Sequence, residues 1–134
     1  MEDIEEDLKK LIHQLVHKDM GLIHVNGSNI TVRVFEQDAR LSLATSVYSG
    51  GNYIPKSVRT SLTGQVPFDQ HRISTFLTID EPNYQIFLNF QGMLQTVDKR
   101  KFRELLEEFS WLAEEWRLYL DEHDRHDLIH VRVL

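Results

Sequence analysis

The sequence predicts an α+β fold, a two-layer sandwich in which helices cover one face of an antiparallel sheet. Two amphipathic helices, at 3–17 and 98–122, each carry a single apolar stripe. Between them, five strand-like segments alternate apolar and polar residues. Such strands give a sheet with two different faces, and helices with one apolar stripe bury that stripe on one of them.

The first half of the chain supplies a helix and three strands. Acidic residues crowd the first turn of the helix, where the helix dipole favours negative charge. Asn26-Gly27 predicts a hairpin turn between strands at 22–25 and 30–35, and a third strand follows at 41–47. The apolar side of the helix consists of Ile4, Leu8, Leu11, Ile12 and Leu15.

The second half supplies a short helix, two strands and a long helix. Pro55 near the start of 54–62 favours a helix there, because proline is suited to the first helical turn. A second hairpin joins strands at 73–79 and 84–90. The predicted order is therefore α-β-β-β-α-β-β-α.

The last helix has two unequal sides. Its apolar stripe consists of Phe102, Leu105, Leu106, Phe109, Leu112, Ala113, Trp116 and Leu120. Trp111 and Leu118 fall on the opposite side, among glutamates. Two interpretations stay open: the tail, 121–134, covers this outer side, or the outer side contacts another protein. The tail alternates from Leu128 to Leu134, which favours an added strand.

Composition excludes several functional classes. The 134 residues predict one domain, 1–134, and the absence of Cys excludes disulfides and thiolate sites. The net charge of −6 argues against binding to nucleic acid. We find no apolar run of membrane-spanning length and no signal-peptide pattern, so we expect a cytoplasmic protein without a membrane partner.

No arrangement of residues indicates catalysis or a cofactor. Phosphate-binding glycine loops and nucleophile motifs are absent, so we expect no enzyme. His123, His126 and His130 stand among carboxylates, but their spacing suits a metal only if the helix continues through them. His13 and His17 lie on the polar side of the first helix, without the Glu of a zinc-protease motif. We therefore predict no metal site.

Three aromatic residues point to a protein-binding surface. Phe35, Phe76 and Phe87 fall on the strand faces that the helices leave uncovered, if the faces are assigned as above. An extended peptide could bind there by adding a strand and seating alternate side chains in pockets. The alternative is that these aromatics belong to the core and the two faces are reversed.

In its order of elements the chain resembles the class I type III secretion chaperones, a Tir-chaperone-like family. The resemblance covers about residues 4–120. It rests on the opening helix Ile4–Val16, the turn Val25–Ile30, the short helix Ile54–Leu62 followed by Thr63-Gly64, the hairpin of Phe76–Ile79 and Tyr84–Leu88, and Phe109, Ala113, Trp116 and Arg117 in the closing helix.

The resemblance implies a cytoplasmic homodimer without enzymatic activity. Such a protein holds the N-terminal chaperone-binding segment of a secreted effector extended and aids its delivery to the secretion apparatus. It implies a dimer interface at Tyr53, Ile54, Val58 and Leu62. We expect the cargo-binding residues to be Phe35, Phe76, Phe87, Trp111 and Leu118. Two alternatives remain: an adaptor of the same fold without a secretion role, and a ligand-binding cone with a deep pocket.

Overall fold

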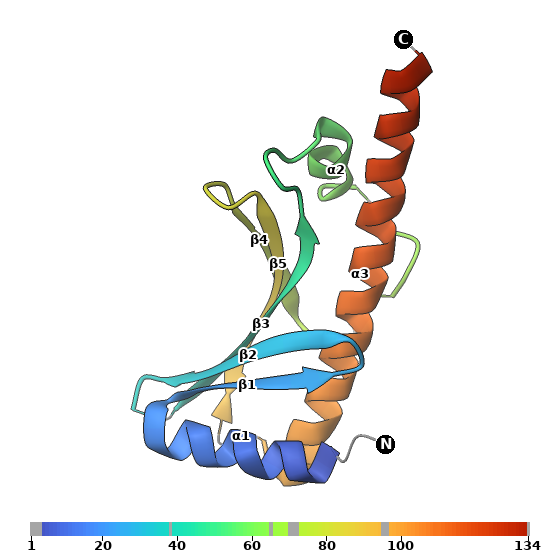
Figure 1. The fold of residues 1–134 in the computed structure, drawn as a ribbon. Coiled ribbons are helices and arrows are strands. Elements are labelled where there is room, and N and C mark those ends of the chain that lie inside the picture. Colours follow the sequence, from blue (N-terminus) through green and yellow to red (C-terminus); the bar gives the residue numbers. More distant parts are fainter. Residues whose placement is uncertain (1–3, 38, 65, 70–72, 95–96, 134) are drawn as a thin grey trace.

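The computed structural model describes residues 4–37, 39–64, 66–69, 73–94 and 97–133, with the backbone alone for 125–133. It has the predicted order of elements (Figure 1). These are α1 (Ile4–Lys18), β1 (Met20–Val25), β2 (Ser28–Phe35), β3 (Arg40–Ser49), α2 (Lys56–Ser61), β4 (Thr75–Asp80), β5 (Gln85–Met93) and α3 (Lys99–Val133).

The strands form one antiparallel sheet in the order β1-β2-β3-β5-β4. The β1–β2 hairpin closes at Asn26-Gly27, whose φ angles of 47° and 83° are those of a tight primed turn, which glycine and asparagine adopt readily. The order leaves β1 and β4 as the two edge strands. The predicted α+β sandwich, with helices on one face of an antiparallel sheet, is confirmed.

The core lies between the sheet and its helices. Alternate residues of β1, β2 and β3 are buried, as strand geometry requires. Helix α1 packs on β1, α3 crosses β3, and α2 packs on α3 (Figure 1). The largest fully buried side chains come from the sheet and from both long helices and include Leu8, Leu11, Ile30, Leu43, Leu88 and Phe109.

Helix α3 confirms the predicted stripe and corrects the predicted tail. Of the eight predicted stripe residues, seven are buried and Leu105 is partly buried. The alternation from Leu128 to Leu134 predicts a strand, whereas α3 continues as a helix through Val133. The sequence after Leu120 contains no glycine or proline, so no residue there ends the helix.

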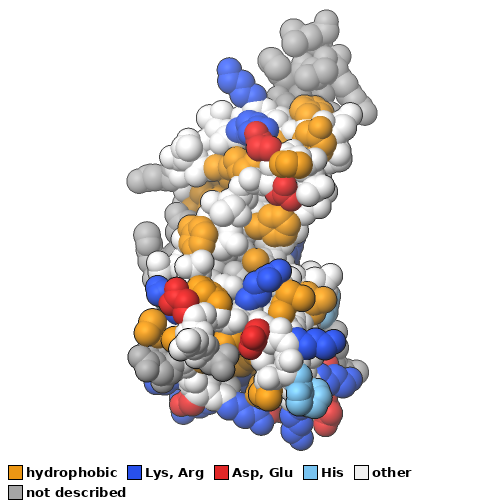
Figure 2. Space-filling view, turned by 90° about the vertical axis from the view of Figure 1, so that its left-hand side faces the viewer, with side chains coloured by type: hydrophobic (Ala, Val, Ile, Leu, Met, Phe, Trp, Pro, Cys, Tyr) orange, Lys and Arg blue, Asp and Glu red, His pale blue; other side chains and the backbone are white. Residues whose placement is uncertain are grey.

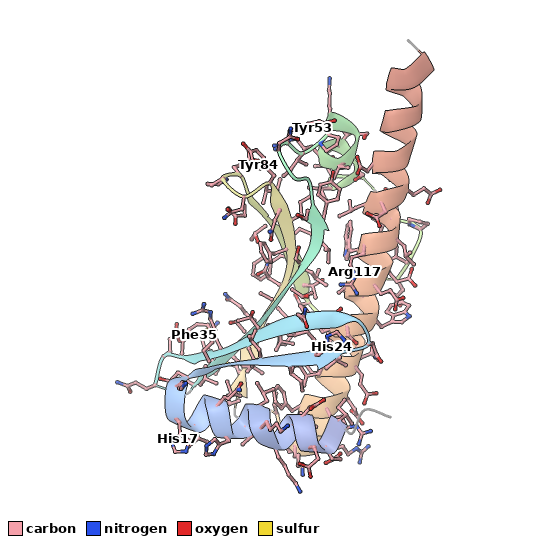
Figure 3. The ribbon with its side chains drawn as sticks, viewed as in Figure 1. His17, His24, Phe35, Tyr53, Tyr84 and Arg117 are labelled. Atoms are coloured by element: carbon pink, nitrogen blue, oxygen red, sulfur yellow. The ribbon has the colours of Figure 1, made fainter. Side chains whose placement is uncertain are left out.

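Two polar contacts fix the β1–β2 hairpin to α3. The Asn26 amide donates to the Ser110 hydroxyl across 3.2 Å, and the Arg117 guanidinium donates to the Ser28 hydroxyl across 2.8 Å. Ser28 and Ser110 are both buried, so each hydroxyl needs such a partner. Figure 3 shows Arg117 reaching from α3 toward the hairpin. These contacts hold the closed end of the hairpin against the middle of α3.

A β-bulge in β3 turns Tyr48 toward α3. The β3–β5 register shifts between Ser46 and Tyr48, so that the consecutive residues Val47 and Tyr48 are both buried. The carboxylate of Asp124 on α3 acts on the Tyr48 hydroxyl through its charge and as a hydrogen-bond acceptor. Burial, reinforced by the charge and the hydrogen bond of Asp124, raises the pKa of Tyr48 to about 12.

The raised pKa of Tyr48 predicts a loss of stability at alkaline pH. The unfolded chain releases the Tyr48 proton near its ordinary pKa of about 10, whereas the folded chain keeps it until about 12. The stabilisation is thus complete below pH 10 and is lost as the pH rises to 12. We expect the free energy of unfolding, measured by urea denaturation, to fall less over this window in Tyr48→Phe. Equal slopes for the two proteins would contradict the assignment.

Candidate protein-binding surfaces

The face of the sheet that points away from the helices, here the open face, carries all three predicted aromatics. In the strand registers Phe87 stands opposite Ser46 and Thr78, and Phe76 stands opposite Asn89. Phe35 stands opposite Arg40. Their neighbours in each strand are the residues that point to the core. The sequence therefore assigned the two faces correctly, while the binding role of the three aromatics stays a prediction.

Phe76 and Phe87 are close in register on the open face. They lie on adjacent strands in diagonal positions, where aromatic side chains can reach one another. Phe76 belongs to edge strand β4 and is 46% exposed, and Phe87 is partly buried. Asn89 fixes this region by donating from its amide to the Thr78 hydroxyl across 3.0 Å. An apolar surface thus lies directly beside an edge strand.

The opposite edge strand, β1, also shows apolar side chains on the open face. Met20 and Leu22 are 41% and 63% exposed, and they stand opposite Arg33 and Thr31. Seen from the side of the sheet away from α3, hydrophobic side chains form separate patches along the long axis of the molecule (Figure 2). An extended chain crossing the sheet would contact several of them in turn.

Phe35 stands apart from the other two aromatics. Figure 3 shows it at the end of β2 that is distant from α3, with Tyr84 and Tyr53 at the other end of the molecule. In the registers, Arg40 separates it from Met93, which is 40% exposed. The three predicted aromatics therefore share one face without forming one cluster.

Trp111 and Leu118 lie outside the open face, on the outer side of α3. They are 42% and 59% exposed. Because α3 is continuous, Ile129 lies about 27 Å along the helix axis from Trp111, at about 1.5 Å per residue. The backbone of the tail therefore does not fold back over Trp111. The structure thus separates the predicted cargo residues into two surfaces.

The predicted dimer segment is largely buried within the chain itself. Val58 is fully buried and Ile54 is 5% exposed, because α2 packs on α3. The Ser57 hydroxyl adds to this packing by donating to the His123 carbonyl across 3.3 Å. Tyr53, which is 54% exposed, and the partly buried Leu62 remain accessible. An interface between copies on this segment would use these two side chains.

An apolar pocket of about 410 Å³ beside α1 was not predicted. Ile12 and Val16 line one side, and Leu94, Val97 and Phe102 line the other. Val16 is 73% exposed. The sequence contained a signal for this pocket. Ile12 and Val16 make the apolar stripe of α1 wider than the part of the helix that the sheet can bury. The pocket opens to the surface, with Asp98 and Lys99 among its residues, unlike the deep polar site of the ligand-binding alternative.

Ionic contacts brace the molecule beside this pocket. Glu5 of α1 bonds to Arg103 across 2.7 Å and to Lys99 across 3.4 Å. Arg103 also bonds to Glu107 across 3.0 Å. The hydrogen bond with Glu107, followed by the charges of Glu107 and Glu5, raises the pKa of Arg103. These pairs are exposed and fix orientation more than they add stability.

The histidines provide no metal centre within the described side chains. Among those residues, no group of three His, Cys, Asp or Glu could hold a metal. His13 and His17 contact each other with ring centroids 4.3 Å apart, and His123 packs on Tyr119. The side chains of His126 and His130 lie outside the described residues, although the helix does continue through both positions.

Several solved structures share the fold of this chain. SycH of Yersinia pestis, a type III secretion chaperone in complex with a fragment of YscM2, is 10% identical with a TM-score of 0.53, covering 83% of this chain and 97% of SycH. A chain of the ExsC–ExsE complex is 16% identical with a TM-score of 0.61, and the match covers 90% of this chain and 97% of that one. A chain of the ExoT–SpcS complex of Pseudomonas aeruginosa is 18% identical with a TM-score of 0.54, and the match covers 86% of this chain and 98% of that one.

No protein-family profile matches the sequence, and no curated protein matches it either. At these identities the solved structures establish the fold alone. Within the described part of the chain, no helix is long and apolar enough to cross a membrane. The function must therefore be argued from the surfaces.

Proposed function

We propose that this protein is a cytoplasmic type III secretion chaperone that binds the N-terminal segment of a secreted effector and keeps it extended. The observation that carries the proposal is the open face. It bears exposed apolar side chains on both edge strands, Met20 and Leu22 on β1 and Phe76 on β4. Exposed apolar patches in such a small protein are characteristic of interaction sites.

The geometry suits an extended chain better than a folded partner. Adjacent strands lie about 4.8 Å apart, so a segment crossing the sheet meets the apolar patches at intervals that an extended peptide can match. The pocket beside α1 adds a place for larger apolar side chains, lined by Ile12, Val16 and Phe102. Binding there would keep apolar residues of the cargo out of water without folding the cargo.

Two further parts of the proposal concern assembly and chemistry. We propose a homodimer that uses Tyr53 and Leu62, the accessible members of the predicted segment. We also propose that the protein has no catalytic activity and acts through binding alone. Light scattering of the purified protein tests the first part, and a monomeric mass at micromolar concentration would contradict it. Its fold neighbour SpcS is found in a complex with ExoT.

The test is direct binding of the N-terminal segments of type III secreted proteins from the organism that produces this protein, measured by calorimetry. For a segment that binds the native protein, we expect Phe76→Asp with Phe87→Asp to weaken binding by at least about 30-fold, because charges replace apolar contacts on the open face beside edge strand β4. The matched control is Gln37→Asp with Asn52→Asp, which adds the same charge in exposed turns and should change binding less than about twofold.

Each outcome has a separate meaning. If no segment binds the native protein, the proposed function is wrong. If a segment binds the native protein and the double variant equally, the open face is not the cargo site. Phe76→Ser, which changes a half-exposed side chain and leaves Phe87 in place, keeps the test valid if the double variant does not fold.

A further inference from the structure

A second surface, independent of the open face, lies where α3 meets the closed end of the β1–β2 hairpin. Two hollows adjoin there because both include Asn26 and Glu107. The first, of about 450 Å³, also contains Glu104, Glu108 and Trp111. The second, of about 360 Å³, also contains Arg103 of α3 and extends past the hairpin to His24 of β1 and to Ile4 and Asp7 of α1. We call the two together the Trp111 groove.

The groove combines an exposed indole with negative charge. Glu107 and Glu108 precede Trp111 by one helical turn, and Glu104 precedes it by two, so all three lie on the same side of α3 as the indole. Trp111 is 42% exposed and fills no cavity in the core. A side chain of this kind contributes little to folding, yet tryptophan is frequent at the centre of protein interfaces.

The carboxylates of the groove already bind guanidinium groups. Glu104 bonds to Arg100 across 3.2 Å and Glu107 bonds to Arg103 across 3.0 Å, each within one turn of α3. Both pairs are exposed and therefore weak, so an incoming cation can share or replace them at little cost. A guanidinium or ammonium group above the indole face would gain cation–π attraction as well.

We propose that the Trp111 groove binds a segment of a partner protein in which arginine or lysine stands next to apolar residues. The cation stacks on Trp111 between the glutamates, and the apolar neighbours extend along α3 toward Leu118. The occupant follows from charge complementarity, since the groove is acidic in a chain of net charge −6.

The groove and the open face lie on different sides of the sheet. The strand side chains of the open face point away from α3, whereas Trp111 projects from the outer side of that helix. A partner in the groove could therefore bind while cargo occupies the open face. The sequence assigned Trp111 and Leu118 to cargo, but the inference does not depend on the proposed function, because its test uses no effector segment.

The test uses a short blocked peptide in which arginine alternates with leucine, and the same peptide with glutamine in place of arginine. Binding is followed by the NMR signal of the Trp111 indole in the full-length protein. We expect the arginine peptide to move this signal and the glutamine peptide to bind at least about tenfold more weakly. Added salt should weaken the binding of the arginine peptide and leave the binding of the glutamine peptide nearly unchanged.

Matched variants separate the groove from general negative charge. Glu104→Gln with Glu107→Gln removes two arginine-paired glutamates from the groove, and Trp111→Ala removes the indole; calorimetry should show each weakening binding by about tenfold. Glu36→Gln with Glu81→Gln removes two glutamates that pair with Arg40 and Arg59 elsewhere, and should leave binding within about twofold.

Several results would overturn the inference. One is equal binding of the arginine and glutamine peptides, a second is equal loss of affinity in the groove variant and its control, and a third is an unchanged affinity in Trp111→Ala. The same would follow if the peptide moved the signals of β4 and β5 in place of the Trp111 indole. Failure of every effector segment to bind, with the arginine peptide still bound, would leave this inference intact and contradict only the proposed function.

Discussion

Replacing Phe109 with alanine is expected to lower the free energy of unfolding by about 3–5 kcal/mol, the range for aromatic truncations in a packed core. Phe109 is fully buried and lies at the centre of the α3 stripe, among the largest buried side chains of the protein. Small domains have a total stability of about 5–15 kcal/mol, so much of the population would unfold at elevated temperature. Urea denaturation followed by circular dichroism measures the change.

Leu118→Ala is the control for this experiment, because it removes an apolar side chain from the same helix. Leu118 is 59% exposed, and its removal should change the free energy of unfolding by less than about 0.5 kcal/mol. If the two variants lost similar amounts of free energy of unfolding, the assignment of the inner and outer sides of α3 would be wrong.

The sides of α3 were predictable because a helix of this length samples its period several times. A stripe with repeated steps of three and four residues admits one orientation toward a core. The two faces of the sheet followed for the same reason, since each strand alternates over several residues. The positions of Phe35, Phe76 and Phe87 on the open face were therefore accessible from sequence.

The tail was not predictable in this way. Seven residues from Leu128 to Leu134 contain too few repeats to separate a strand from one side of a helix. What decides is the segment before them, where no glycine or proline interrupts α3 after Leu120. The absence of a helix stop therefore decides the structure of the tail, and the local alternation does not.

Surfaces made by distant segments were the least predictable. The spacing of Ile54 and Val58 predicts an apolar side of a short helix, but it does not say whether α3 or a second copy covers that side. The pocket beside α1 brings Val16 near Leu94 and Phe102, which are far away in sequence. Such contacts depend on the crossing of α1 and α3 over the sheet, which local patterns do not encode.

The second large effect is expected at Gly50, the first residue of the connection between β3 and α2. A Cβ at this position would lie 2.1 Å from the backbone carbonyl oxygen of Tyr53. Gly50 is also held from the other side, because its N–H donates to the Tyr84 carbonyl across 2.8 Å. Neither backbone segment can move freely, since Ile54 follows Tyr53 directly and is buried in the core.

Gly50→Ala must therefore displace the segment that begins α2, and we expect a loss of about 1–3 kcal/mol in the free energy of unfolding, as for other overpacked sites. Gly64→Ala is the matched control, because a Cβ there meets no atom within 4 Å, and it should be nearly neutral. If the proposed dimer uses Tyr53, Gly50→Ala should also weaken dimerisation more than its stability loss explains. Light scattering at several concentrations separates the two effects: a variant that is destabilised yet dimerises normally would place the dimer interface away from Tyr53.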